Sequence, residues 1–185
     1  MQVRTYVDQE LRVRPDSESE LEGAIEKERE TVTSLRRDVD AEPSELNKSH
    51  LGRELNRLAD HLFLADELEE ATQLKEEALD IWRDLDRQKA AFLSRLNLAE
   101  FHFEAGHHGR AFDILEMLLD QSASGDTEVY RDFVREVYGR CAFRAGRIDE
   151  ALEALEDALD IRRERGNDQQ VEQTEHMLEI VRDAD

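Results

Sequence analysis

Three histidines lie close together near the middle of the sequence and are the first candidates for a metal site. They are His102, His107 and His108, among six histidines in the chain. A helical zinc site needs two ligands one turn apart and a carboxylate or further ligand that completes the set. His107 and His108 are adjacent, so on a helix their side chains would diverge by about 100 degrees. We therefore expect no bound metal and no cofactor, and we interpret these two residues as part of an exposed turn.

Paired carboxylates, such as Glu69 with Glu70 and Glu76 with Glu77, are the second kind of candidate. General acid and base catalysis needs a carboxylate sheltered in a concave pocket, whereas these pairs lie on a segment that we expect to face water. The sequence has no glycine-rich phosphate loop, no dinucleotide fingerprint and no nucleophile with a histidine at a recognisable spacing. The single cysteine, Cys141, falls among apolar residues and is predicted to be buried. We expect a protein that is not an enzyme.

Acidic side chains dominate the composition. The 185 residues include 46 Asp and Glu against 25 Lys and Arg, which gives a formal net charge of −21. Such a charge repels phosphate backbones and anionic lipid surfaces, so we expect no nucleic-acid partner. No run of about 18 apolar residues occurs, and the first residues contain no apolar signal core. We therefore expect no membrane insertion and a cytoplasmic location.

The sequence repeats itself at an interval of 40 residues. Segments that begin at Phe63, Phe103 and Phe143 align without gaps, and six positions carry the same residue in all three copies. These positions are Phe63, Phe103 and Phe143; Ala65, Ala105 and Ala145; Ala71, Ala111 and Ala151; Glu76, Glu116 and Glu156; Leu79, Leu119 and Leu159; and Asp80, Asp120 and Asp160. A gapless repeat of this length is typical of a protein built from stacked structural units.

Each copy has the periodicity of two helices. In the middle copy the first helix runs from about Lys89 to Ala105. Its apolar residues recur every three or four positions and are Leu93, Leu96, Ala99 and Phe103. A second helix follows in each copy and opens with an alanine, which lets two antiparallel helices approach closely. One such hairpin cannot bury its own apolar face, so successive hairpins must stack into a solenoid.

The break between the two helices carries a turn residue. In two copies it is Gly106 or Gly146, which we expect to adopt the left-handed conformation that ends a helix. In the first copy Asp66 stands at this position, with Glu69 three residues later. We interpret Asp66 and Glu69 as a capping box for the helix that follows.

These features resemble the tetratricopeptide repeat. The resemblance rests on Leu-Ala pairs in the first helices, Ala-Gly turns between the helices, and Ala-Leu-Asp-Ile at the end of two second helices; the residues are Leu58 and Ala59, Leu98 and Ala99, Ala105 and Gly106, Ala145 and Gly146, and the segments 78–81 and 158–161. It covers roughly Ser44 to Arg165. The 40-residue interval exceeds the common 34 residues and is similar to the long-repeat type of kinesin-light-chain-like and cell-polarity adaptor proteins. The resemblance implies an all-α, right-handed α-solenoid of three tetratricopeptide-like hairpins.

The rest of the chain is expected to flank these repeats. Ser17 and Glu20 form a capping-box signal, and an apolar stripe then predicts one long helix to about Val39. That helix either caps the first repeat or pairs with a copy of itself in a homodimer. We expect four segments: a flexible or extended arm at 1–16, this helix at 17–43, three repeats at 44–167, and a C-terminal capping helix at 168–185.

In tetratricopeptide arrays the first helices line the concave surface, so the resemblance also implies a binding groove. Residues 66–80, in a second helix, hold seven acidic side chains and one basic, whereas residues 129–145, in a first helix, hold four arginines and two acidic residues. This difference favours a partner peptide or helix that carries acidic and apolar residues. The groove candidates are Arg53, Asn56, Asp60, Leu93, Asn97, Glu100, Phe133, Glu136, Arg140 and Arg144.

The resemblance implies a non-catalytic protein–protein interaction module, an adaptor or scaffold that binds a partner segment in the groove. Two alternatives stay open. One is a small acidic cytoplasmic chaperone of the secretion-translocator type, because such chaperones have a similar size, charge and repeat number. The other is a regulator that self-associates through the helix at 17–43.

Overall fold

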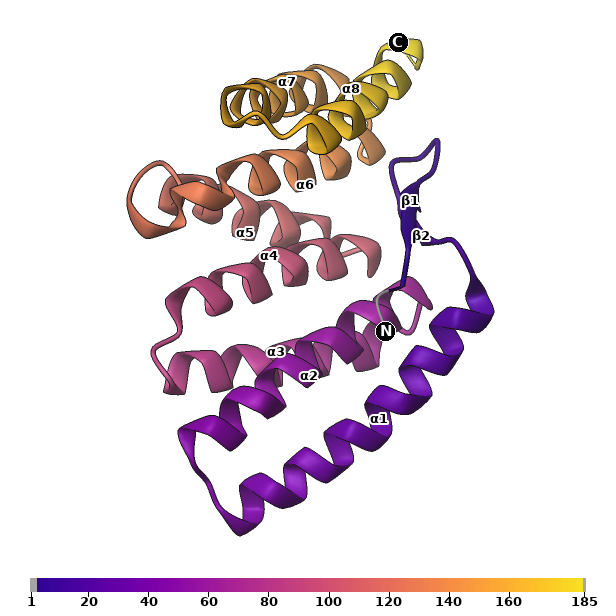
Figure 1. Ribbon diagram of the computed structural model, residues 1–185. Coiled ribbons are helices and arrows are strands. Elements are labelled where there is room, and N and C mark those ends of the chain that lie inside the picture. Colours follow the sequence, from indigo (N-terminus) through magenta and orange to yellow (C-terminus); the bar gives the residue numbers. More distant parts are fainter. Residues whose placement is uncertain (1–2, 185) are drawn as a thin grey trace. The chain divides into compact units, whose positions relative to one another are not determined.

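The structure is a computed structural model that describes residues 3–184. Within this range the chain is mostly helical, and its helices pack in successive pairs (Figure 1). The helices are α1 (Glu18–Ala41), α2 (Glu45–Leu64), α3 (Leu68–Asp84), α4 (Gln88–Glu104), α5 (His108–Gln121), α6 (Arg131–Arg144), α7 (Ile148–Arg165) and α8 (Asp168–Asp183), with a short 3-10 helix η1 (Gly125–Tyr130) before α6. The expected all-α class is confirmed.

Packing divides the chain into two compact units, which we describe separately. Unit 1 contains residues 3–6 and 15–111, and unit 2 contains residues 7–14 and 112–184. The boundary falls within α5, inside the stretch where three repeats were expected. The division of the chain at residues 16, 43 and 167 stays a prediction. Met1 and Gln2 of the expected arm, and Asp185 of the expected C-terminal helix, lie outside the described residues.

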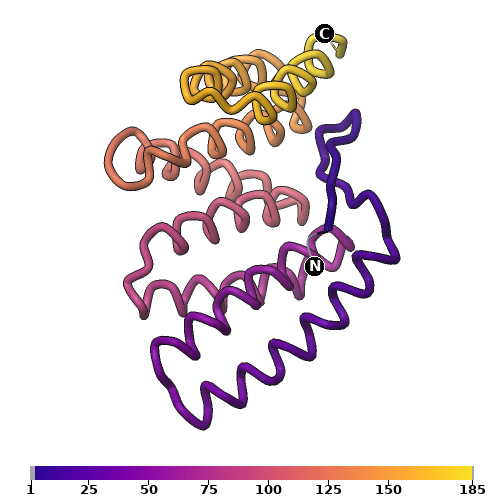
Figure 2. The backbone as a smooth tube through the Cα atoms, viewed as in Figure 1, coloured from indigo at the N-terminus to yellow at the C-terminus, as the bar shows by residue number. Residues whose placement is uncertain are grey.

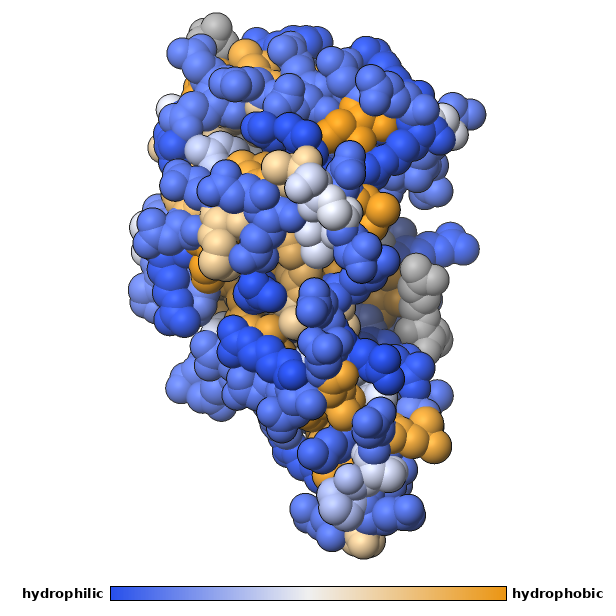
Figure 3. Space-filling model, turned by 90° about the vertical axis from the view of Figure 1, so that its left-hand side faces the viewer, coloured by the Kyte–Doolittle hydropathy of each residue, from blue (hydrophilic) through white to orange (hydrophobic). Residues whose placement is uncertain are grey.

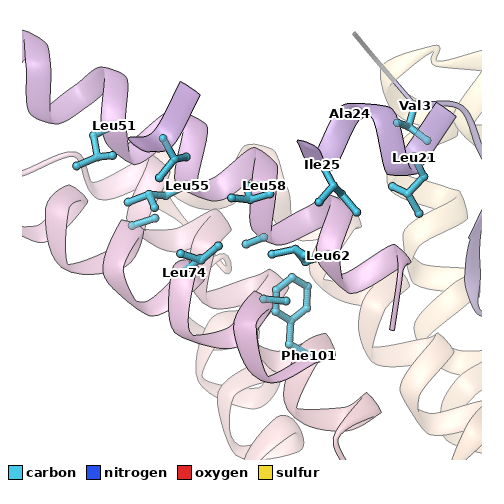
Figure 4. Close-up of a cluster of buried hydrophobic side chains, with 14 residues drawn as sticks. Val3, Leu21, Ala24, Ile25, Leu51, Leu55, Leu58, Leu62, Leu74 and Phe101 are labelled. Atoms are coloured by element: carbon cyan, nitrogen blue, oxygen red, sulfur yellow. The ribbon is translucent and has the colours of Figure 1, made fainter. Parts of the chain in front are cut away.

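In unit 1, the long N-terminal helix α1 covers α2 (Figure 1). Ser17 is its N-cap, and the Ser17 hydroxyl accepts a hydrogen bond from the Glu20 backbone N–H at 3.3 Å. The apolar stripe of α1 is buried against α2; Figure 4 shows Leu21 and Ile25 of α1 beside Leu58 and Leu62 of α2. The apolar stripe of α1 thus forms part of the core of unit 1.

Ion pairs also join α1 to its neighbours. Arg29 lies 3.0 Å from a carboxylate oxygen of Glu67 and 2.6 Å from one of Glu70, both at the start of α3. The carboxylate of Glu28 is buried and lies 2.8 Å from Nδ1 of His61 in α2. Part of the acidic charge expected on the outer face of α3 is thus neutralised by α1.

The turns between paired helices use left-handed residues at equivalent positions. Gly106 and Gly146 have φ of 81° and 75°, as expected from the sequence. Asp66 has φ of 60° and takes the same conformation, so the expected capping box is wrong. The N-cap of α3 is Glu67, and no side chain caps this helix. Aspartate tolerates the left-handed region better than most residues, so it replaces glycine there and does not act as a cap.

A short β-hairpin precedes α1. Its strands are β1 (Thr5–Val7) and β2 (Val13–Pro15), where an arm of loose extended chain was expected. The turn is organised by Asp8, whose Oδ1 accepts backbone N–H bonds from Glu10 and Arg12, each at 2.9 Å. At the tip, Leu11 is fully buried in the core of unit 2. The segment expected to be a flexible or extended arm is therefore a hairpin with a buried side chain at its turn.

In unit 2, α6, α7 and α8 follow one another as packed neighbours (Figure 2). Their core includes Leu155 and Leu159 of α7 with Met177 and Leu178 of α8. A charged pair also lies inside this unit: the Arg162 guanidinium donates from Nε to Oδ2 of Asp132 at 3.1 Å, and both side chains are at most 2% exposed. Arg165 donates to the other oxygen of Asp132 at 2.5 Å, so the buried carboxylate is fully engaged.

The same two repeat positions hold a different pair in unit 1. Gly52 and Trp82 precede Asp132 and Arg162 by 80 residues each. A Cβ atom on Gly52 would lie 2.8 Å from Cζ2 of Trp82, so glycine makes room for the indole. At equivalent repeat positions, unit 1 thus packs Gly52 against Trp82, whereas unit 2 has the buried ion pair of Asp132 and Arg162.

The face drawn in Figure 3 is mostly hydrophilic, with apolar residues in small separate patches. This agrees with the 38% of charged residues in the sequence. Among residues 3–184, no helix is both long enough and apolar enough to cross a bilayer.

Candidate partner-binding surface

Six of the ten groove candidates lie in unit 1, on the neighbouring helices α2 and α4. Arg53 is exposed, and Leu93, in α4, is 36% exposed. The others are partly exposed: Asn56, Asp60, Asn97 and Glu100. We call the surface formed by Arg53, Asn56, Asp60, Leu93 and Asn97 the α2–α4 surface.

Hydrogen bonds bring three of these candidates together. Nδ2 of Asn97 in α4 donates to Oδ1 of Asp60 in α2 at 2.9 Å. One turn earlier, the Ser94 hydroxyl donates to Oδ1 of Asn56 at 3.1 Å. The two helices are thus joined by hydrogen bonds between side chains, of which Asp60 is 45% exposed and Ser94 is buried.

A buried lysine from α3 completes this network. Nζ of Lys75 donates to Oδ1 of Asp60 at 2.5 Å and to the backbone carbonyl of Asn56 at 3.0 Å. The same ammonium lies 5.5 Å from the ring centroid of Phe101 in α4. The pKa of Lys75 is lowered, because burial disfavours the charged form and outweighs the attraction to Asp60.

Sequence reasoning missed Lys75 and Ser94. A signal for Lys75 was present, because the 40-residue register aligns it with Leu115 and Leu155, which are fully buried. A lysine at a position that is leucine in two other copies indicates a polar partner in the core. Ser94 offered no such signal, since a serine in a helix is usually exposed.

The other four candidates lie on α6 in unit 2 and have different surroundings. Phe133 is 38% exposed, with the Arg162 guanidinium 5.5 Å from its ring centroid. Glu136 forms an ion pair with Arg162, with its carboxylate 2.5 Å from Nη1, and Nε of Arg140 lies 3.7 Å from Glu136. Arg140 is only 5% exposed, so it belongs mainly to the interior, whereas Arg144 is partly exposed. Helical phase and the family resemblance predicted Glu136 and Arg140 at a surface. In the structure Glu136 pairs with the buried Arg162, and Arg140 lies beside Glu136.

The three clustered histidines have separate roles. His107 and His108 are exposed in the turn before and at the start of α5, and the His108 ring stacks on Phe103 with centroids 4.3 Å apart. His102 is buried, which lowers its pKa, and the charges of Arg110 and His107 lower it further. Within residues 3–184, no three His, Cys, Asp or Glu side chains are grouped so as to hold a metal ion. Cys141 is buried, as predicted.

The helical pairs and their left-handed turns have a known counterpart. Residues 91–164 match the tetratricopeptide repeat family. The match begins in α4 and ends in α7. Tetratricopeptide repeats generally mediate protein–protein interactions. No curated protein matches the chain.

Proposed function

We propose that this protein is a non-catalytic interaction module that binds an extended segment of a partner protein on the α2–α4 surface. The observation that carries the proposal is the hydrogen-bonded set of Asn56, Asp60 and Asn97 on two neighbouring helices. Amide and carboxylate side chains at a surface can pair with the N–H and C=O groups of an extended main chain.

The chemistry of the partner follows from the two residues that flank this set. Arg53 lies one turn before Asn56 on α2, and its positively charged side chain is exposed. Leu93 lies one turn before Asn97 on α4 and presents a partly exposed aliphatic side chain. A segment with an acidic residue and an apolar residue near its main-chain contacts would match both.

A double variant, Arg53→Glu with Leu93→Asp, tests the proposal by affinity capture from the native cell lysate and mass spectrometry. Neither wild-type side chain is buried, so the variant should remain folded. The matched control is Arg37→Glu with Met117→Asp, which changes an exposed arginine of α1 and a 39% exposed methionine of α5. We expect a partner that wild type and control retain and the first variant loses; equal capture by all three contradicts the proposal.

Finer assignments are also proposals. The 40-residue interval supports membership in the long-repeat type. A cytoplasmic location stays a proposal. The secretion-chaperone alternative predicts that the protein prevents aggregation of an apolar client. The self-association alternative predicts a mass that rises with concentration in light scattering and that falls when α1 carries charged substitutions on its exposed side.

A further inference from the structure

Lys75 of α3 is buried beneath the α2–α4 surface and is hydrogen-bonded to two of its residues, Asn56 and Asp60. Its side chain is 1% exposed although it carries an ammonium group. The equivalent positions in the other copies are Leu115 and Leu155, both fully buried. The hairpin fold therefore accepts leucine at this position, and the lysine of the first copy requires another explanation.

Stability does not supply that explanation. Taking an ammonium out of water carries a large desolvation penalty, and replacing a buried ion pair by apolar side chains of similar volume is often neutral or stabilising. The partner of Lys75, Asp60, is 45% exposed, so the pair is not shielded on both sides. The buried ammonium of Lys75 instead contacts Asp60, a residue of the α2–α4 surface that is accessible to water.

The contacts of Lys75 fix the polar groups of that surface. Its Nζ atom bonds Oδ1 of Asp60 and the backbone carbonyl of Asn56, and Nδ2 of Asn97 bonds the same Oδ1. In the described part of the chain, the hydrogen bonds of this network do not use Oδ2 of Asp60, Oδ1 of Asn97 or Nδ2 of Asn56. These atoms are two acceptors and one donor. The negative charge of Asp60 is balanced by the ammonium of Lys75.

We propose that Lys75 is a positioning residue that holds Asp60, Asn56 and Asn97 as a site for the main-chain amide groups of a partner segment. This inference rests on the proposed function and adds the kind of contact that the partner makes. Because the Lys75 ammonium balances the Asp60 carboxylate, the site favours a neutral N–H donor over a lysine or arginine side chain. Without Lys75, the same carboxylate would be an unbalanced anion that attracts cations.

The first test needs no partner. Lys75→Met keeps the length and apolar stem of the side chain and removes the ammonium, and Lys89→Met at an exposed position of α4 is the matched control. We expect the side-chain amide resonances of Asn56 and Asn97 to shift in Lys75→Met and to stay unchanged in Lys89→Met. The melting temperature of Lys75→Met should equal or exceed that of wild type, and a fall below both other proteins would mean that Lys75 serves stability.

The second test uses a phage-displayed library of random peptides as the probe. Peptides selected on the wild-type chain are synthesised with a fluorescent label, and their binding is compared among wild type, Asp60→Ala, Lys75→Met and Lys89→Met. We expect Asp60→Ala and Lys75→Met each to weaken binding by about tenfold or more, as loss of a charge-assisted contact does, with Lys89→Met unchanged.

The two proposals fail in different ways. If wild type selects no peptide, or if the selected peptides bind Asp60→Ala as tightly as wild type, then the α2–α4 surface is not the binding site and both proposals are wrong. If Asp60→Ala loses binding and Lys75→Met does not, the surface stands and the role of Lys75 is overturned. Selected peptides rich in lysine and arginine would also contradict the preference for a neutral donor.

Discussion

Gly139 of α6 lies directly against Leu155 of α7, so closely that a Cβ atom on Gly139 would fall 2.7 Å from Cγ of the leucine. The equivalent positions to Gly139 in the other copies are Ala59 and Ala99, both fully buried. The close approach of α6 and α7 at Gly139 therefore depends on the absence of a methyl group at this position.

We predict that Gly139→Ala destabilises the protein by about 1–3 kcal/mol, because the added methyl overpacks the helix crossing. Gly23→Ala is the matched control, since a Cβ there meets nothing within 4 Å and the site lies inside α1. In this control the alanine should stabilise by about 0.5–1 kcal/mol through its better helix propensity. Urea unfolding measures both, and effects of the same sign at the two glycines would contradict the packing at Gly139.

Asp132 is the buried acceptor for both Arg162 and Arg165. Asp132→Asn keeps the shape of the side chain but removes the buried negative charge beside Arg162 and leaves Glu136 as its carboxylate partner. We expect a loss of about 3 kcal/mol. Glu175→Gln removes the surface partner of Arg163, whose ion pair is about half exposed, and should cost less than about 1 kcal/mol. Chemical denaturation of the two variants compares them; similar midpoints would show that the interior pair does not hold unit 2 together.

His102 gives the fold a dependence on pH. Burial, followed by the charges of Arg110 and His107, lowers the pKa of His102 below the ordinary value of 6.5. The unfolded chain therefore takes up this proton first as pH falls, so the contribution of neutral His102 to stability is complete above about pH 6.5 and declines at lower pH. We predict that His102→Leu, the residue found at position 62, flattens the stability profile between about pH 7 and pH 5.

The control for His102 is His176→Leu at an exposed position of α8. Its profile of unfolding free energy against pH should follow that of wild type. If His102→Leu retains the wild-type slope, the loss of stability in acid comes from other groups.

Leu11 anchors the N-terminal hairpin in unit 2. We predict that Leu11→Ala costs about 2–5 kcal/mol, because the side chain is fully buried among residues of α6, α7 and α8. Leu46→Ala in α2 provides a matched control at 64% exposure and should change stability by less than about 0.5 kcal/mol. Hydrogen exchange should show faster exchange of the Arg12 amide in Leu11→Ala only; unchanged protection would place the anchor of the hairpin elsewhere.

The helices could be read from the sequence because their signals are local. Apolar residues three or four positions apart predicted the helix after Ser17 and the helix at 89–105, Ser17 marked the start of α1, and glycine at positions 106 and 146 marked the left-handed turns. Asp66 was misread because aspartate suits both an N-cap and a left-handed turn, and only its φ of 60° decides between them.

Part of the α2–α4 surface also follows from a local signal, the spacing of residues along each helix. Helical phase placed Asn56, Asp60 and Asn97 on one side of two neighbouring helices, and the structure joins them by hydrogen bonds. Helical phase says nothing about what approaches from a third helix. Arg140 was therefore expected at a surface although it is 5% exposed, and Lys75 was overlooked although it holds the network from below.

The sequence by itself determined that the chain is a series of helical hairpins, because periodicity and turn chemistry involve residues only a few positions apart. Only the tertiary structure decided which charges are buried. Lys75 meets Asp60 from another helix, and Arg162 meets Asp132 across 30 positions of sequence. The free energy of burying a charge depends on such distant partners, and no local pattern of residues specifies them.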